Sequence, residues 1–192
     1  PMYSRRLEEQ GGTGADRFAR RTLSTMCLIL VSCFALCFVF MEPIVRVTNF
    51  GFAADGRLEP AVKASRITVG YPVFLCLVAG LSGILNSRKV FAAPAVAYVV
   101  LNLTFVASLA LVVPKTGEPL LVLSWSVVVA GVLQLAVVAV SCWRRGVDLR
   151  PMLPRFDDDM KRLALLMGPG LVSAGVQQLN LLVGGAVASL QV

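Results

Sequence analysis

The stretch TLSTMCLILVSCFALCFVFM, residues 22–41, decides the fold because it contains no charged side chain over its whole length. At a helical rise of about 1.5 Å per residue, such a run crosses about 30 Å, which is the thickness of the hydrocarbon core of a bilayer. The basic segment 1–21 precedes it, and the sequence GGTG at 11–14 predicts a flexible break there. Residues 22–41 therefore predict a first membrane-spanning helix.

Runs of the same kind recur along the chain. Uncharged segments of spanning length occupy 67–87, 90–113, 120–143 and 163–192. The connector 42–66 begins with PIVRVTNFGF, which predicts a short interfacial segment, and continues as a solvated stretch. We therefore predict an all-α polytopic membrane protein with about five transmembrane helices. Its expected parts are a cytoplasmic basic segment (1–21), four helices with their connectors (22–162) and a truncated fifth helix (163–192).

The composition supports this class and disfavours several kinds of chemistry. The chain is 57% hydrophobic and 15% charged, with a mean hydropathy of +0.77, whereas a soluble domain of 192 residues exposes far more charge. Histidine, the commonest general base and metal ligand, does not occur. The five cysteines form no CxxC pair and are interpreted as small apolar residues of membrane helices. We expect no catalytic residue, no metal and no cofactor.

Lysine and arginine are distributed unevenly between the two sides that successive spans define. Thirteen of the eighteen precede the first span or follow the second and fourth, and five follow the first and third. The positive-inside rule then predicts a cytoplasmic N-terminus. The same excess explains the net charge of +7, and no basic patch with interleaved aromatic residues is present. We therefore expect no nucleic-acid partner.

Two local motifs have structural interpretations. Gly80, Gly83 and Asn86 recur every third residue in the second span, and small residues of this kind let a neighbouring helix approach closely. The sequence RFDDDMKRL at 155–163 resembles a metal site, but three adjacent carboxylates on a helix diverge by about 100° per residue. We interpret this acidic run as the N-cap and first turn of the fifth helix.

The fifth span carries the candidate functional residues. At 100° per residue, Ser173, Gln177 and Asn180 fall on one stripe of the helix, and Gln178 falls apart from it. Such a stripe faces either another helix, through hydrogen bonds between amides, or a hydrated cavity, and the pattern alone leaves both open. Gly168, Pro169 and Gly170 weaken the helical ladder just before the stripe and predict a hinge.

Several stretches, taken in order, carry a family resemblance. They are PMYSRRLEE (1–9), GFAAD (51–55), YPVFLCLVAGLSGILNSRKVFAAPAVAYVVLNL (71–103), LSWSVVVAGVLQL (123–135) and MGPGLVSAGVQQLNLLVGGAVASL (167–190). This series resembles the MurJ/MviN family of lipid II flippases, within the multidrug/oligosaccharidyl-lipid/polysaccharide exporter superfamily. Two positions depart from the family's usual pattern: Phe50 stands where proline is frequent, and Gly184-Gly185 stands where Asp or Asn followed by Thr is frequent.

The resemblance implies a two-lobe transporter of fourteen helices, of which this chain is a fragment covering helices three to seven. It implies a protein of the bacterial inner membrane, surrounded by membrane lipids, that is not an enzyme. Its partner would be an anionic lipid-linked substrate, the undecaprenyl-pyrophosphate disaccharide peptide, moved by alternating access of the two lobes. The essential membrane arginines of the family fall outside this chain.

Two other functions remain open from the sequence. One is a drug or polysaccharide exporter of the same superfamily, which an acidic residue in the central cavity of the complete protein would favour. The other is a non-transporting, truncated membrane remnant with a structural role only.

Overall fold

The computed structural model of this chain describes residues 2–48 and 56–152, with the backbone alone given for residues 2, 4–10 and 13. Five single residues beyond these ranges are also described, and all are helical: Leu165, Gly168, Gln178, Val183 and Gly184. The chain divides into two compact units, one made of Pro1–Ala35 with Ile67–Pro154 and the other of Leu36–Arg66 with Arg155–Val192. Each unit is described here by itself.

Four helical stretches among the described residues are long and apolar enough to cross a membrane. They are Gly14–Val39, Leu58–Ser87, Ala92–Thr116 and Pro119–Arg144. Each stretch overlaps one of the first four predicted spans over most of its length, so the all-α polytopic fold class is confirmed. The fifth predicted span, at 163–192, lies outside the described residues apart from the five single positions.

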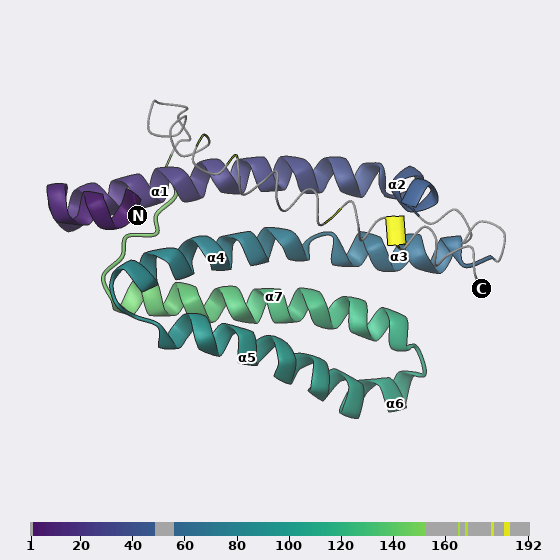
Figure 1. Ribbon diagram of the computed structural model, residues 1–192. Coiled ribbons are helices and arrows are strands. Elements are labelled where there is room, and N and C mark those ends of the chain that lie inside the picture. The colour runs from purple at the N-terminus through teal and green to yellow at the C-terminus, as the bar shows by residue number, and fades with distance from the viewer. Residues whose placement is uncertain are drawn as a thin grey trace. The chain divides into compact units, whose positions relative to one another are not determined.

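Helix α1 (Met2–Val39) begins well before the predicted first span (Figure 1). Gly11, with a φ of 68°, interrupts the helical backbone inside the predicted GGTG break. The spanning stretch then starts at Gly14, so residues 14–21 belong to the same helix as the span instead of forming a separate segment. Arginine is a good helix former, and a helix does not have to end where the hydrocarbon ends.

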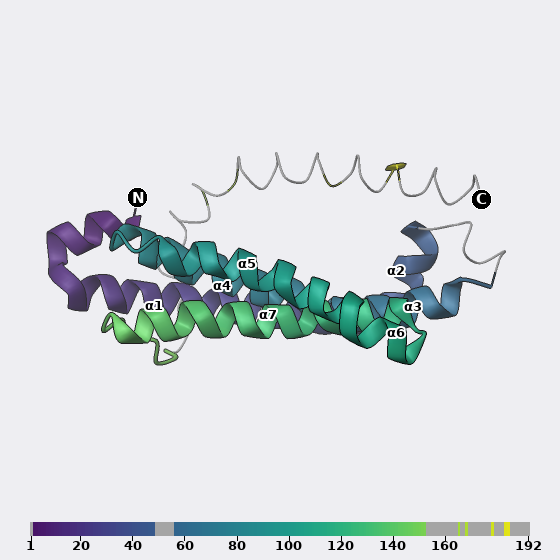
Figure 2. The ribbon, with the colours of Figure 1, turned by 90° about the horizontal axis from the view of Figure 1, so that it is seen from below.

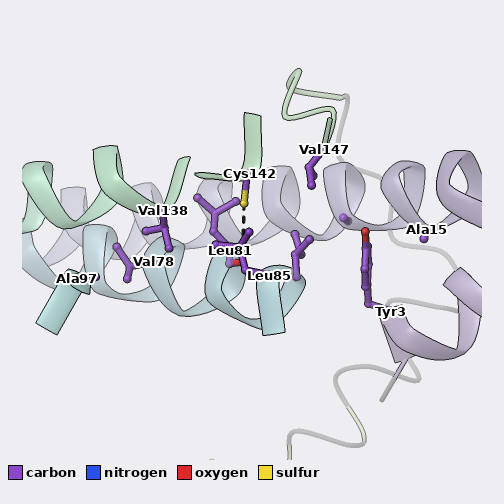
Figure 3. Close-up of a cluster of buried hydrophobic side chains, with 11 residues drawn as sticks. Tyr3, Ala15, Val78, Leu81, Leu85, Ala97, Val138, Cys142 and Val147 are labelled. Carbon is purple, nitrogen blue, oxygen red and sulfur yellow. Dashed lines mark hydrogen bonds between the residues drawn. The ribbon is translucent and has the colours of Figure 1, made fainter. Parts of the chain in front are cut away.

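The first unit is built around α4 (Tyr71–Ser87), α5 (Ala92–Ala107) and α7 (Pro119–Arg144), which run alongside one another (Figures 1 and 2). The seam between them is apolar: Leu81 and Leu85 of α4 and Val138 and Cys142 of α7 recur one helical turn apart and are buried together (Figure 3). The Cys142 thiol lies 3.9 Å from the carbonyl oxygen of Leu81. This packing makes α7 the central helix of the unit.

A π-helical turn, η2 (Ser108–Val112), follows α5 directly and leads into the short helix α6 (Val113–Thr116). Pro114 stands just after this turn, and a proline inside a helix cannot donate to the carbonyl four residues earlier and clashes with it. The wider turn before Pro114 accommodates this break. Gly117, with a φ of 67°, then ends α6 in the left-handed region and lets the chain reverse into α7.

In the second unit, α2 (Met41–Thr48) occupies the start of the predicted interfacial segment. Met41 and Val45, one turn apart, are its buried residues, while Arg46 and Glu42 form an exposed ion pair of 2.9 Å on the same short helix. Apolar residues on one face and charges on another make α2 amphipathic, as an interfacial segment requires.

Helix α3 (Leu58–Thr68) lies in the stretch that the sequence predicted to be solvated, and all of its residues except Ala64 are partly or fully exposed. The charged residues of LEPAVKASRIT are spaced among good helix formers, so they do not prevent a helix. The guanidinium carbon of Arg66 lies 5.9 Å from the centroid of the Phe38 ring, within cation–π range. The spanning stretch Leu58–Ser87 is accordingly longer than the predicted span 67–87.

Candidate functional site

A polar network joins the start of α1 to the ends of α4 and α7. Arg88, directly after α4, donates from Nη2 to the Asp16 carboxylate over 2.6 Å and from Nε to the Tyr3 hydroxyl over 2.9 Å. Tyr3 in turn donates to the same Asp16 oxygen over 3.0 Å. The third Arg88 contact is to the carbonyl oxygen of Arg145, at the end of α7, over 3.1 Å. One guanidinium therefore holds three segments of the chain together.

The environment of this network changes the proton affinity of its members. Burial raises the pKa of Tyr3 above its ordinary value, and the hydrogen bond to Asp16 acts in the same direction, although Arg88 opposes both. Burial by itself lowers the pKa of Arg88, but the contacts with Tyr3 and Asp16 outweigh it and the pKa is raised. Arg88 thus remains a cation and Tyr3 a neutral donor, which is the protonation state that the hydrogen bonds require.

A second ion pair strengthens the same end of the unit. Arg20 contacts Asp148 over 2.7 Å and donates to the carbonyl oxygen of Arg150 over 2.7 Å. The backbone amide of Met152 donates to the Ser24 hydroxyl over 3.0 Å. These contacts bind the segment after α7 along the first turns of the α1 span. The arrangement pairs each of the two carboxylates, Asp16 and Asp148, with an arginine, so it works as a structural clamp.

Cations dominate the surface around this clamp. Arg17, Lys89, Arg144, Arg145 and Arg150 are exposed there, next to Trp143, the exposed aromatic residue at the end of α7. Within the described part of the first unit, Lys115 is the only cation near the opposite turn between α6 and α7. The first unit therefore has one strongly basic end, and aromatic and basic residues at a helix end are typical of a membrane interface.

Halfway along the bundle, a buried glutamine links three helices. The side chain of Gln134 in α7 is 1% exposed and donates from Nε2 to the carbonyl oxygen of Ala97 in α5 over 3.0 Å. Its Oε1 accepts from the Tyr71 hydroxyl of α4 over 3.4 Å. One turn earlier, Gly131 lets the rings of Tyr71 and Phe74 approach so closely that an added Cβ would lie 3.0 Å from both. Gly131 and Gln134 together mark a close contact of α7 with α4 and α5.

The sequence prediction did not single out Gln134 or Gly131. Their signal was present, since a lone amide stands in the uncharged stretch 120–143 with a glycine three residues, or about one turn, before it. The contact between Asp16 and Arg88 spans 72 positions, and nothing local in the sequence indicated it. Asn102, the polar residue in the middle of the third predicted span, donates only to the Tyr98 carbonyl of its own helix.

The three residues of the predicted small-residue stripe of α4, Gly80, Gly83 and Asn86, do not share one helix contact. A Cβ added to Gly80 would lie 2.9 Å from Leu23 Cδ2, so α1 passes close to α4 there, whereas Gly83 has open space around it and Asn86 is exposed. The physical reason is the helical period: a step of three residues turns by about 300°, so each member lies about 60° away from the previous one. Only Gly80 faces α1 in the described part of the chain.

The candidate hinge and cavity residues fall almost entirely outside the described residues. Pro169, Gly170, Ser173, Gln177 and Asn180 are among those not described, as are Asp157, Asp158 and Asp159. Gly168 is helical, and a Cβ added to it would meet nothing within 4 Å. Gln178, which the helical wheel separates from the stripe, is exposed. Among the described residues, no three metal-binding side chains come together.

The sequence of this chain is similar to those of known proteins. The family described as Lipid II flippase MurJ matches residues 1–192. A probable lipid II flippase MurJ of Rhizobium tropici is 36% identical over 98% of this chain and 36% of its own length. A second from Rickettsia prowazekii is 32% identical over 91% of this chain and 34% of its own length. The lipid II flippase MurJ of Burkholderia cenocepacia is 35% identical over 72% of this chain and 28% of its own length.

The chain spans about a third of the length of the curated relatives that it matches. The match nevertheless extends over every residue of the chain, and the four apolar helices fit a transporter of this kind. The chain belongs to the lipid II flippase MurJ family.

Proposed function

We propose that the complete protein carrying this chain moves lipid II, the lipid-linked peptidoglycan precursor, across the bacterial inner membrane by alternating access. The family match over residues 1–192 is the observation that carries the proposal. Four apolar helices of spanning length give the chain the form of a transporter segment. The substrate itself would be the undecaprenyl-pyrophosphate disaccharide peptide, an anion on a long lipid tail.

This chain would contribute to the helical scaffold of the transporter more than to the cationic part of its substrate site. The uncharged cores of its four described spans contain no cation that could neutralise a pyrophosphate. Arg88, Asp16 and Gln134 are instead used in holding α1, α4, α5 and α7 together. We assign the cationic part of the substrate site to the rest of the complete protein, and one wall of the cavity to Ser173, Gln177 and Asn180.

The orientation proposed has the basic end of the first unit in the cytoplasm, as the distribution of lysine and arginine favours. It is tested with single cysteines at Thr13, Gly117 and Gly146 in a cysteine-free form of the complete protein. An impermeant thiol reagent added outside intact cells is expected to label only the cysteine at Gly117. Labelling at either of the other two positions would reverse the orientation.

The transport function is tested by gene replacement. The complete protein is expressed in a bacterium depleted of its own lipid II flippase, and lipid II in the outer leaflet is measured with a membrane-impermeant probe. Restored growth together with outer-leaflet lipid II is the expected result. A correctly inserted protein that restores neither, or that exports a cationic drug instead, would contradict the proposed function.

We also propose that Gly168, Pro169 and Gly170 form a hinge in the fifth span. Proline removes one backbone donor, and glycine lowers the cost of bending. Replacing all three by alanine should slow the exchange between inward- and outward-accessible states in the complete protein. Unchanged transport and accessibility in that variant would rule out a hinge at this position.

A further inference from the structure

A hollow of about 500 Å³ lies between η2–α6 and the first half of α7. Its lining is almost entirely apolar, with Trp125, 58% exposed, on its α7 side. The hydroxyls of Thr116 and Ser126 are directed to carbonyl oxygens of their own helices, at 3.2 Å and 2.7 Å. Apart from Ser108 and Glu118, the lining therefore presents methyl and methylene groups and the Trp125 ring, and it favours a hydrocarbon occupant.

The length of the hollow limits what this hydrocarbon is. From Glu118, just before α7, to Val129 the lining of the hollow extends over twelve residues, a rise of about 16 Å. A second hollow of about 460 Å³ shares Ser108 and Val112 and extends the groove to Leu133, about 22 Å from Glu118. A helix that spans the hydrocarbon core needs about 30 Å. An acyl chain entering from one leaflet matches the groove better than a spanning helix does.

Two residues of opposite charge stand in α6 and in the turn from α6 into α7. Glu118 lines the hollow, and Lys115 stands three residues before it in α6. Both side chains are exposed, and within the described ranges neither takes part in an ion pair. A phosphate would be attracted to Lys115 and an ammonium group to Glu118, whereas a head group with negative charge alone would be repelled by Glu118.

We propose that this hollow binds one zwitterionic phospholipid of the phosphatidylethanolamine type. One acyl chain lies between η2 and α7 against Trp125, and the head group bridges Lys115 and Glu118. The widened π-turn before Pro114 places Ser108 and Val112 on the wall that the chain contacts. The binding site belongs to the surface of the α5–α7 hairpin.

The unaltered complete protein gives the first test. It is reconstituted in nanodiscs that contain phosphatidylethanolamine with a diazirine on one acyl chain, illuminated, and digested for mass spectrometry. Labels are expected on the hollow, at Val112, Trp125 and their neighbours, severalfold above those from a matched phosphatidylglycerol probe. Equal labelling by the two probes would overturn the head-group assignment. Labelling no stronger than at Leu109, which lines neither hollow, would overturn the site.

Two variants sharpen the result. Val112→Trp fills the hollow and should abolish its labelling, while Leu109→Trp, on the same π-turn but outside both hollows, should leave labelling unchanged. The double charge removal Lys115→Gln with Glu118→Gln should reduce the phosphatidylethanolamine labelling to the phosphatidylglycerol level. If a cysteine at Val112 instead crosslinks to another helix of the complete protein, protein fills the hollow and the proposal is wrong.

Discussion

The guanidinium of Arg88 meets the carboxylate of Asp16 at 2.6 Å, and this pair joins the end of α4 to the beginning of the α1 span. Both side chains are largely shielded from solvent, with exposed fractions of 20% and 15%. A charge-assisted hydrogen bond in such a setting is worth more than a pair in open water. The contact therefore bears directly on the stability of the first unit.

Removal of this pair should destabilise the protein. Arg88→Gln leaves Asp16 and Tyr3 with incomplete hydrogen bonding, and we expect a loss of about 1–3 kcal/mol of unfolding free energy. The matched control is Arg46→Gln, because the Arg46–Glu42 pair is an exposed pair within one helix, for which about 0.5 kcal/mol is expected. Unfolding in mixed micelles measures both. Equal losses in the two variants would show that the Arg88 network has no special weight.

Alanine at Gly131 should separate α7 from α4. The new Cβ would lie 3.0 Å from ring carbons of Tyr71 and Phe74, and overpacking of this kind costs about 1–3 kcal/mol. Gly83→Ala is the control, since that position is open and the exchange should be neutral or stabilising by about 0.5–1 kcal/mol. Thermal unfolding in detergent compares the two. The packing argument fails if Gly83→Ala is the more harmful change.

Leucine at Gln134 should loosen the three-helix contact without leaving a cavity. The carbonyl of Ala97 and the hydroxyl of Tyr71 would each lose a partner, and we expect a loss of about 1 kcal/mol, which is the scale of interhelical hydrogen bonds in membranes. Asn102→Leu is the control because the amide of Asn102 contacts only its own helix. Unfolding measurements that place the two variants at the same stability would contradict the role given to Gln134.

The ionisation of Tyr3 should make the first unit sensitive to alkali. Because burial raises the pKa of Tyr3 in the folded protein, its contribution is fully present below the ordinary pKa near 10 and is lost as the pH rises through the folded value. The difference in phenolate absorbance between the wild-type protein and Tyr3→Phe isolates this group from the other tyrosines. A titration at or below the ordinary tyrosine value would show that Tyr3 is not buried by the network.

The proposed cavity wall is tested by thiol accessibility in the complete protein. Cysteines at Gln177 and Asn180 should react with small polar reagents, whereas cysteines at Leu182 and Val183, on other faces of the helical wheel, should be protected. Gln177→Leu should reduce transport more than Gln178→Leu does. Protection of Gln177 and Asn180 in both inward- and outward-open states would make these amides interhelical contacts.

Uncharged runs of spanning length were sufficient to predict four membrane helices but not their ends. An uncharged run such as 120–143 indicates which residues can lie in the hydrocarbon core. Helix α7 extends only one residue beyond this run at each end. At α1 and α3 the helix continues into charged sequence, because helix formation depends on backbone propensity as well as on hydrophobicity. Boundaries were therefore predicted best where a proline or a basic pair coincides with the end of the apolar run.

Interhelical partners could not be predicted in the same way. Gln134 was visible as a lone amide, but its partner, the backbone carbonyl of Ala97, carries no signature in the sequence. Gly80, Gly83 and Asn86 looked like a stripe only because a spacing of three was treated as one face. An apolar run of the sequence predicts that a membrane helix exists. It does not predict how the helix packs, because the packing depends on contacts between residues far apart in the chain.

The π-turn at Ser108–Val112 gives the α5–α7 hairpin a place to absorb changes in chain length. Ala97 and Gln134 are 37 positions apart, and the turn at Gly117 joins the two arms that carry them. The π-turn in the α5 arm contains one residue more than an α-helical turn would. Deleting one residue there, together with Pro114→Ala, should therefore leave a continuous α-helix. Ala97 would then stay opposite Gln134. The α7 arm has no such turn, and one inserted residue between Pro119 and Gln134 would rotate the glutamine by about 100° away from its partner. Insertions and deletions in this hairpin should therefore be tolerated before Gly117 and not after it.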